Sequence, residues 1–403
     1  MRNIHHDVVR QLGLHWSPQK IEDWNNQLPV ERLEELKNPY PPPGKFVCED
    51  DNIRQLWHRR IMEAKQADKR LKRCEPLVID SKELVRTVGV SENLVVRDSL
   101  TGEIVLMVVR QFCRDIDIIA WMEDIVVEAV DICRNIRKED PGHLTIAGFS
   151  AGSRSNPQFH WAKNVIRKLA PEDVLAFRQR QSCAFALFWN MLLKRLPPEI
   201  LDEWRGWIAR EAMPGMNPLF SAGENSGNRG VCEFPVYNGT CKLSSVEYAP
   251  PSGVMAQNYA RAIHCEKQPH KWSASYTLNR DGFQDGDGGH FFVSAYGIRV
   301  LCAPDTLIVW QPRHYHGTSL QRLDPYNKDP SLLQRGISFV TSPRLPTIWK
   351  RYREEVEKIR VECSTNEEKS AKWEQVAEAS ESALLDPFDD SDEIYFSEGS
   401  VDK

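Results

Sequence analysis

The chain has 403 residues, of which 41% are hydrophobic and 27% charged, a composition typical of a soluble globular protein with a sizeable core. Its 52 basic and 57 acidic residues give a formal net charge of -5, so the chain as a whole is not expected to attract polyanions. The longest strongly apolar run, residues 184–193, is far shorter than the roughly 20 residues of a transmembrane helix. No secretory signal is visible after Met1, so we expect an intracellular protein, either nuclear or cytoplasmic.

A basic segment stands out in the first part of the chain. Eight Lys or Arg residues between positions 54 and 73 surround four apolar residues whose spacing places them on one helical face, namely Trp57, Ile61, Ala64 and Leu71. The segment therefore predicts a basic surface helix. In a chain of net negative charge, contact with the phosphates of a nucleic acid has to be local, and this helix is the candidate for it.

Residues 1–225 are expected to form a mainly helical N-terminal region with one β-hairpin. In chain order, the further elements expected there are the hairpin of residues 93–97 and 103–110, a helix over 118–133, and two helices within 171–213. The tryptophans at 204 and 207 are expected in the core. A Gly- and Asn-rich break at 221–230 marks the end of this region.

Short strands are expected after the break, in a second domain over residues 226–348. They are the runs 273–278, 291–295, 298–301, 306–310 and 336–341. Strands of this length and spacing are typical of a sandwich or barrel, so the fold class expected for the chain is α+β. Residues 349–403 complete the chain with a charged helix and an acidic tail, which the composition of residues 386–402 predicts to be disordered.

The densest group of potential metal ligands lies within this strand-rich part. His264 and Glu266 are two residues apart, so they point the same way in an extended segment, and His316 follows 52 residues after His264. Two imidazoles and one carboxylate on one face of an octahedral ion leave three positions open, as in the non-haem Fe(II) oxygenases. Arg335 begins a later strand run, where its guanidinium could pair with a carboxylate in a bidentate manner.

A family resemblance is carried by six segments, which are residues 258–266, 271–272, 288–293, 296–300, 303–306 and 316–317. Together they resemble the core of the 2-oxoglutarate/Fe(II) dioxygenases and, more narrowly, the fungal branch of the ten-eleven-translocation and base-J-binding-protein group. The resemblance covers residues 230–348. It implies a double-stranded β-helix, or jelly roll, with Fe(II) bound by His264, Glu266 and His316, 2-oxoglutarate bound by Arg335, and Asn258 as a further residue at the site.

The reaction that this resemblance implies uses O2 and 2-oxoglutarate, releases succinate and CO2, and hydroxylates a C–H bond of the target. In the family the target is the methyl group of a modified pyrimidine in nucleic acid. Two residues depart from the family pattern: Glu266 stands where the usual ligand is Asp, and His290 stands where relatives often have an acidic residue.

Three other hypotheses fit parts of the sequence. The run 144–152 contains a G-x-S-x-G motif in which Ser150 would be the nucleophile of an α/β-hydrolase, provided that a helix follows the motif. His314 and His316, also two residues apart, would be ligands in a cupin-like barrel with Glu266 or His264. A β-helix whose metal site is degenerate would be a binding module without catalysis.

Overall fold

The computed structural model describes residues 3–67, 74–220, 228–327 and 329–363, together with the isolated residues 368 and 372. The predicted acidic tail and the end of the basic segment, residues 68–73, lie outside the described residues. Within the described ranges, no helix has the length and apolar character needed to cross a membrane.

The helices begin and end where capping and apolar spacing indicate. Their bounds are α1 (Ile4–Gln11), α2 (Pro18–Asn26), α3 (Asp51–Ala67), α4 (Ile116–Ile132), α5 (Pro171–Leu192), α6 (Pro198–Glu211) and α7 (Leu345–Glu362). The carboxylate of Asp115 accepts a hydrogen bond from the Ile118 N–H and caps α4, whereas α5 and α6 begin with proline. The predicted helices at 118–133 and within 171–213 are confirmed, Trp204 and Trp207 lie in the core, and Trp57 and Ile61 share the buried face of α3.

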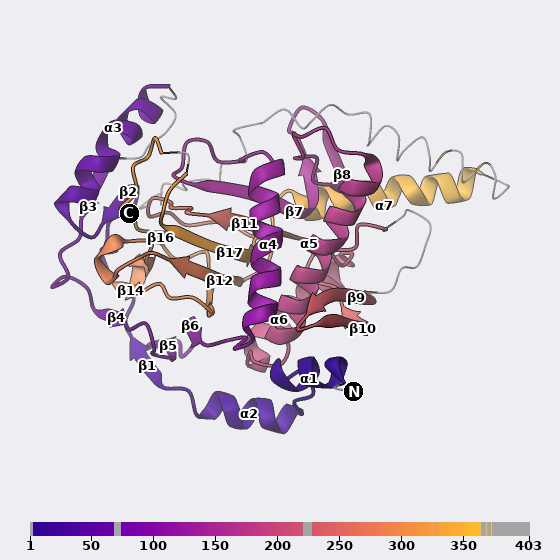
Figure 1. Ribbon diagram of the computed structural model, residues 1–403, viewed down its shortest axis with the longest axis horizontal. Coiled ribbons are helices and arrows are strands. Elements are labelled where there is room, and N and C mark those ends of the chain that lie inside the picture. Colours follow the sequence, from indigo (N-terminus) through magenta and orange to yellow (C-terminus); the bar gives the residue numbers. More distant parts are fainter. Residues whose placement is uncertain are drawn as a thin grey trace.

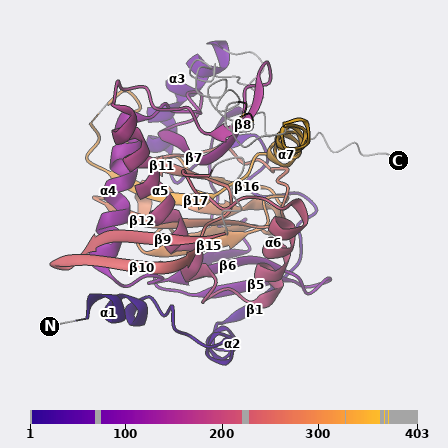
Figure 2. The same cartoon turned by 90° about the vertical axis from the view of Figure 1, so that its right-hand side faces the viewer.

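A large, almost wholly antiparallel sheet forms the centre of the molecule (Figures 1 and 2). Its strand order is β1-β5-β6-β15-β12-β17-β11-β7-β8, and only β1 and β5 pair in parallel. The bounds are β1 (Val30–Leu33), β5 (Leu94–Asp98), β6 (Ile104–Arg110), β15 (Thr306–Trp310), β12 (Ser273–Asp281), β17 (Leu333–Phe339), β11 (Ser252–Gln257), β7 (His143–Gly152) and β8 (Pro157–Trp161). The predicted hairpin corresponds to β5 and β6, and the predicted strands at 273–278, 306–310 and 336–341 are confirmed as β12, β15 and β17.

A smaller sheet faces the central sheet. It has the order β16-β13-β14-β4, with bounds β16 (His316–Thr318), β13 (Phe291–Val293), β14 (Ile298–Val300) and β4 (Arg86–Val88). Two further pairs stand apart, β9 (Arg229–Val236) with β10 (Gly239–Glu247) and β2 (Lys45–Cys48) with β3 (Cys74–Val78). Two short 3-10 helices, η1 (Asp285–Asp287) and η2 (Ser294–Tyr296), adjoin β13.

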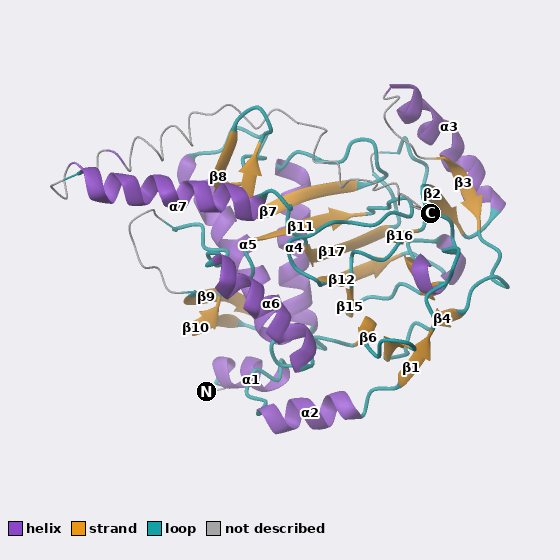
Figure 3. Cartoon of the chain, turned by 180° about the vertical axis from the view of Figure 1, so that it is seen from behind, coloured by secondary structure: helices purple, strands orange, loops and turns teal. Residues whose placement is uncertain are grey.

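The two faces of the central sheet have different neighbours. On β15, Leu307 and Val309 pack into the core shared with α4 and α5, whereas Ile308 and Trp310 pack against residues of the smaller sheet. This alternation follows from the two-residue period of a strand. One face of the large sheet is therefore covered by helices and the other by the smaller sheet. Helix α7 packs beside β8 and β7 (Figure 3).

The observed class is mixed α and β, as expected. The central sheet takes β1, β5, β6, β7 and β8 from residues before 226 and β11, β12, β15 and β17 from residues after it. The division of the chain into parts 1–225, 226–348 and 349–403 stays a prediction.

Candidate metal centre

Backbone pairing brings the two histidines of the predicted triad together. His264 and His316 form an isolated antiparallel bridge, in which each N–H donates to the carbonyl of the other at 2.8 Å. Residues that lie opposite each other in such a pair project to the same side, and the two ring centroids are 4.4 Å apart. Gly317 permits this approach, since a Cβ there would lie 2.8 Å from the carbonyl oxygen of Arg261.

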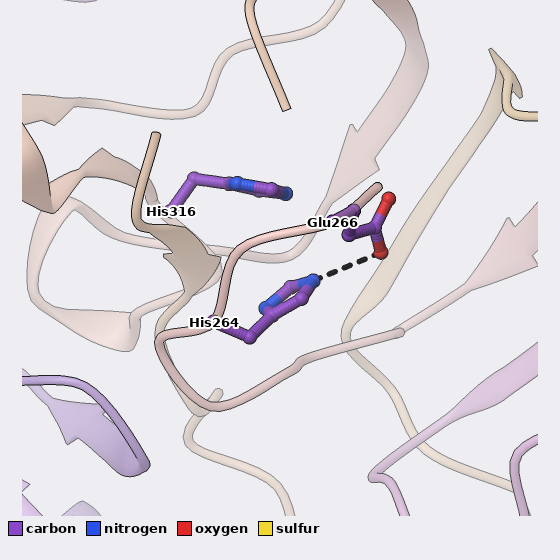
Figure 4. A group of neighbouring side chains, drawn as sticks. All are labelled: His264, Glu266 and His316. Carbon is purple, nitrogen blue, oxygen red and sulfur yellow. Dashed lines mark hydrogen bonds and ion pairs between the residues drawn. The ribbon is translucent and has the colours of Figure 1, made fainter. Parts of the chain in front are cut away.

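Glu266 completes the cluster. Its N–H donates to the carbonyl of Pro312 at 2.8 Å, and its Oε1 lies 3.0 Å from Nε2 of His264. His264, Glu266 and His316 form a group of potential ligands whose donor atoms all lie within 4.8 Å of one another (Figure 4). The three residues are 4%, 9% and 4% exposed, respectively.

The hydrogen bonds fix which nitrogen of each imidazole is free. Nδ1 of His264 donates to the carbonyl of Ala262 at 2.8 Å, and Nδ1 of His316 donates to the carbonyl of His314 at 2.8 Å. Because a carbonyl only accepts, Nδ1 of each ring is protonated, which leaves Nε2 of each ring as the atom that can bind a metal. This is the orientation that ligating histidines require.

The charge states favour a bound cation. Burial lowers the pKa of His264 below its usual value and the pKa of His316 to about 3, so both are neutral at pH 7. Burial raises the pKa of Glu266, but contact with His264, with His316 and with the Arg261 guanidinium lowers it by more, so this carboxylate is ionised. Two Nε2 atoms and an ionised carboxylate oxygen thus converge on one point, as the ligands of a cation do.

The spacing of the His264 and Glu266 donor atoms fits an ion of the first transition row. Ligand atoms about 2.1 Å from an ion in adjacent octahedral positions are roughly 3 Å apart, and the His264 and Glu266 donor atoms are separated by 3.0 Å. Gln268 donates from Nε2 to the other carboxylate oxygen of Glu266 at 3.0 Å and so orients it.

A cavity of about 230 Å³ lies between the two sheets and is bordered by all three potential ligands. The central sheet contributes alternate residues to its wall, including Val254, Ala256, Ser275, Thr277, Gly336 and Ser338, and the smaller sheet contributes Phe291 and residues 316–318. Trp310 and Ile308 add apolar surface. The three potential ligands therefore border a mostly apolar cavity that is partly open to solvent.

The guanidinium of Arg335 is engaged elsewhere. Arg335 borders the cavity, but its Nη1 donates to Oε1 of Glu123 on α4 at 2.5 Å, and its Nε donates to Oε1 of Gln257 at 2.7 Å. Along β17, Ile337 and Phe339 share its side of the strand and pack in the core next to the helices. The register of β17 turns the odd-numbered positions toward α4, where Arg335 forms these contacts. The binding of 2-oxoglutarate by Arg335 stays a prediction.

The side chains of Asn258 and His290 form hydrogen bonds to backbone groups. The Asn258 amide donates to the carbonyl of Leu332 at 2.8 Å and accepts from the Gln334 N–H at 2.7 Å, and its side chain does not border the cavity. His290 accepts from the Cys302 N–H at 3.0 Å and donates from Nε2 to the carbonyl of Asp285 at 2.9 Å. Burial lowers the pKa of His290 to about 3, so it is a neutral residue that fastens two loops.

His314 is not part of the triad. Its Nδ1 lies 3.4 Å from a carboxylate oxygen of Glu35, and its ring packs against Tyr296 with centroids 5.2 Å apart. The cupin-like alternative with His314 as a ligand therefore does not fit, because its ring projects away from the cluster.

The G-x-S-x-G motif lacks the structure of a nucleophile elbow. Ser150 lies within β7, its Oγ accepts from the Gly152 N–H at 3.2 Å, and the chain continues into the paired strand β8. Gly152 has a φ of +65°, which suits the turn between these strands. An elbow needs a helix after the serine, so the hydrolase hypothesis is wrong on this point.

Sequence reasoning missed a buried polar group beside the triad. Arg261 borders the cavity and its Nη1 is 3.9 Å from Oε1 of Glu266. Tyr259, also at the cavity, donates from its hydroxyl to Oδ2 of Asp140 at 2.8 Å. The available signal was a single arginine within the otherwise apolar run 260–263.

No family model and no curated protein matches this chain. A solved structure to which it is similar is that of NgTET1 in complex with 5mC DNA, with 11% sequence identity and a TM-score of 0.39, over 73% of this chain and 92% of that one. A similarity at this level carries no weight for function, which is therefore argued from the chain's own residues.

Proposed function

We propose that the chain is a 2-oxoglutarate/Fe(II)-dependent dioxygenase. The observation that carries the proposal is the convergence of Nε2 of His264 and Nε2 of His316 with the ionised carboxylate of Glu266 at the wall of a mostly apolar cavity. Two neutral imidazoles and one carboxylate form the ligand set of the non-haem Fe(II) oxygenases. We propose in addition that the two facing sheets are the two halves of a double-stranded β-helix.

The protein's own residues have distinct tasks in this proposal. Ala262 and His314 hold the imidazoles through their carbonyl oxygens, and Gln268 holds the carboxylate. Fe(II), when bound, supplies the oxidative decarboxylation of 2-oxoglutarate by O2 and the transfer of one oxygen atom to a C–H bond. The apolar walls restrict water, which protects a reactive centre from side reactions.

The proposed target is the methyl group of a modified nucleic-acid base. Its support is the resemblance in residues 258–317 and the basic character of α3. On α3, Arg54 pairs with Asp51 and Arg59 pairs with Glu63, so much of the described charge is locally balanced. Incubation with methylated DNA and RNA oligonucleotides tests the target, and a gain of one oxygen atom by mass spectrometry is the expected result.

Succinate formation tests the reaction itself. Purified protein with Fe(II), ascorbate and 2-oxoglutarate is expected to form succinate well above the level of His316→Ala, which removes one ligand. His314→Ala is the matched control, because this histidine lies two residues away and outside the triad, and it is expected to retain activity. Equal succinate formation by wild type and His316→Ala would refute the proposal and favour the binding module without catalysis.

A further inference from the structure

Arg261 is a buried cation whose hydrogen bonds are incomplete. The residue is 6% exposed, and its Nε has no hydrogen-bond partner among the described residues. Oε1 of Glu266 is 3.9 Å from Nη1, beyond the length of a hydrogen bond, while the Tyr259 hydroxyl is hydrogen-bonded to the guanidinium and the Asp140 carboxylate lies near its charge. A buried donor without an acceptor costs about 1–3 kcal/mol, and more when it is charged, so the geometry calls for an acceptor supplied from outside the chain.

We propose that Arg261 binds a carboxylate group of the anionic cosubstrate beside the metal, the role that the sequence assigns to Arg335. This inference rests on the proposed function. Arg261 borders the same cavity as His264 and Glu266, so an acceptor placed there reaches the guanidinium and the metal together. A planar guanidinium is also the side chain best suited to a carboxylate.

The other arginines at the cavity already have anionic partners. Nη1 of Arg335 is 2.5 Å from Glu123, and Nη1 of Arg137 is 3.4 Å from Glu139. On β17, the residues beside Arg335 that share the cavity face are Gln334, Gly336 and Ser338, none of which is cationic. Arg261 differs from both because its Nε lacks an acceptor among the described residues, although Tyr259, Asp140 and Glu266 lie near its charge.

The balance of charge makes Arg261 available when a metal binds. A divalent ion bound at this site would be ligated by the same Glu266 carboxylate that faces Arg261. The ion, the carboxylate and the guanidinium together would then carry a net positive charge. An anion that bridges the ion and the guanidinium neutralises this charge in a space of low dielectric constant. A dicarboxylate such as 2-oxoglutarate meets this requirement.

Arg261 is also held in place for this task. Its carbonyl accepts from the Thr318 N–H at 3.0 Å, which fixes its backbone against β16. Beside it, the side chain of Tyr259 is held by a hydrogen bond from its hydroxyl to Asp140. A guanidinium held in this way loses little conformational entropy when its ligand binds.

Titration calorimetry of 2-oxoglutarate into Mn(II)-loaded protein tests the assignment, since Mn(II) occupies the site without turnover. Arg261→Gln is expected to weaken 2-oxoglutarate binding by at least about tenfold, because it removes a charge-assisted bidentate contact. Its affinity for Mn(II) alone is expected to stay within about threefold of wild type, because Arg261 is not a ligand. Arg335→Gln is the matched control, with an expected 2-oxoglutarate affinity within about threefold of wild type.

The outcomes separate this inference from the proposed function. Weakened 2-oxoglutarate binding in Arg335→Gln together with wild-type binding in Arg261→Gln, or equal losses in both, would overturn the assignment to Arg261 alone. A wild-type protein that binds neither Mn(II) nor 2-oxoglutarate would overturn the proposed function and this inference together. If Arg261→Gln does not fold, the 2-oxoglutarate affinity of Arg261→Lys is measured in its place, because lysine keeps the charge but lacks the planar guanidinium. At least threefold weaker binding supports the inference, and unchanged affinity overturns it.

Discussion

At the scale of single residues, the contact between His264 and Glu266 distinguishes the metal-free from the metal-bound protein. Nε2 of His264 and Oε1 of Glu266 lie 3.0 Å apart and are hydrogen-bonded in the metal-free protein. In the metal-bound protein the same two atoms would be adjacent ligands.

Glu266→Gln is predicted to weaken both the metal-free protein and its binding of metal. The folded protein lowers the pKa of Glu266, so the ionised carboxylate stabilises the metal-free fold, and we expect the free energy of unfolding at pH 7 to fall by about 1–3 kcal/mol. The affinity for Mn(II) is expected to fall by more than about 100-fold, because a charged ligand is lost. Chemical denaturation with a chelator and calorimetry with Mn(II) measure the two effects. Glu266→Asp, which keeps the charge, is the control. A more stable metal-free Glu266→Gln would contradict the account.

His270 is predicted to make stability depend on pH. Burial lowers its pKa to about 4, and its neutral ring donates to the carbonyl of Trp272 at 2.7 Å and packs on Trp204 and Trp207. Since the pKa is about 6.5 in the unfolded chain, the stabilisation is complete above pH 6.5 and is lost as the pH falls toward 4, on the order of 3 kcal/mol.

Urea denaturation of the chelated protein at pH 7 and pH 4.5 measures this dependence. His270→Gln is expected to reduce the difference between the two pH values, because glutamine takes up no proton. A difference as large in His270→Gln as in wild type would show that His270 is not a source of the acid sensitivity.

At the scale of elements, the ion pair between α4 and β17 connects a helix to the centre of the sheet. The side chains of Arg335 and Glu123 are 14% and 18% exposed, and Glu123 also accepts from Asn279 at 2.7 Å. We expect Glu123→Gln to lower the free energy of unfolding by about 1–3 kcal/mol, because it leaves a mostly buried guanidinium without its counter-ion.

A second glutamate on the same helix provides the control. Glu128 pairs with Arg180 at 2.5 Å, but these side chains are 35% and 43% exposed. Glu128→Gln is expected to change the stability by less than about 0.5 kcal/mol. Denaturant titration of both variants checks the prediction, and equal losses would show that burial does not set the strength of the α4 contact.

The strands were largely predictable from the sequence, whereas the side of β17 on which Arg335 projects was not. Alternation and turn residues identified the hairpin of β5 and β6 and the strands β12, β15 and β17, because period and turn chemistry are local properties. The sequence likewise gave the ligand types and spacing of His264, Glu266 and His316, which the bridge between the histidines brings together. The side of β17 on which Arg335 projects depends on pairing with β11 and β12 and on an irregularity between Thr277 and Asn279, which no local pattern encodes. Arg261 was missed because its place beside the cavity depends on elements distant in sequence, such as β16, where the Thr318 N–H donates to its carbonyl.

At the scale of the whole molecule, the central sheet joins strands from both sides of residue 226. A fragment of residues 226–348 lacks β6, which pairs with β15, and β7, which pairs with β11. It also lacks α4 and α5, so the apolar face of β12 and β17 becomes exposed. We expect the fragment to be unfolded or aggregated, because two unpaired edges and one uncovered face remain. Circular dichroism and gel filtration check this, and a soluble, cooperatively folding fragment would support the predicted domain boundary instead.

The position of the triad at the cavity between the two sheets is the central feature of the molecule, and a crystal soaked anaerobically with Fe(II) examines it most directly. The account predicts one strong anomalous peak at the iron absorption edge, about 2.1 Å from Nε2 of His264, Nε2 of His316 and Oε1 of Glu266. A peak that any of these three atoms fails to reach, or no peak in the cavity at saturating Fe(II), would contradict it.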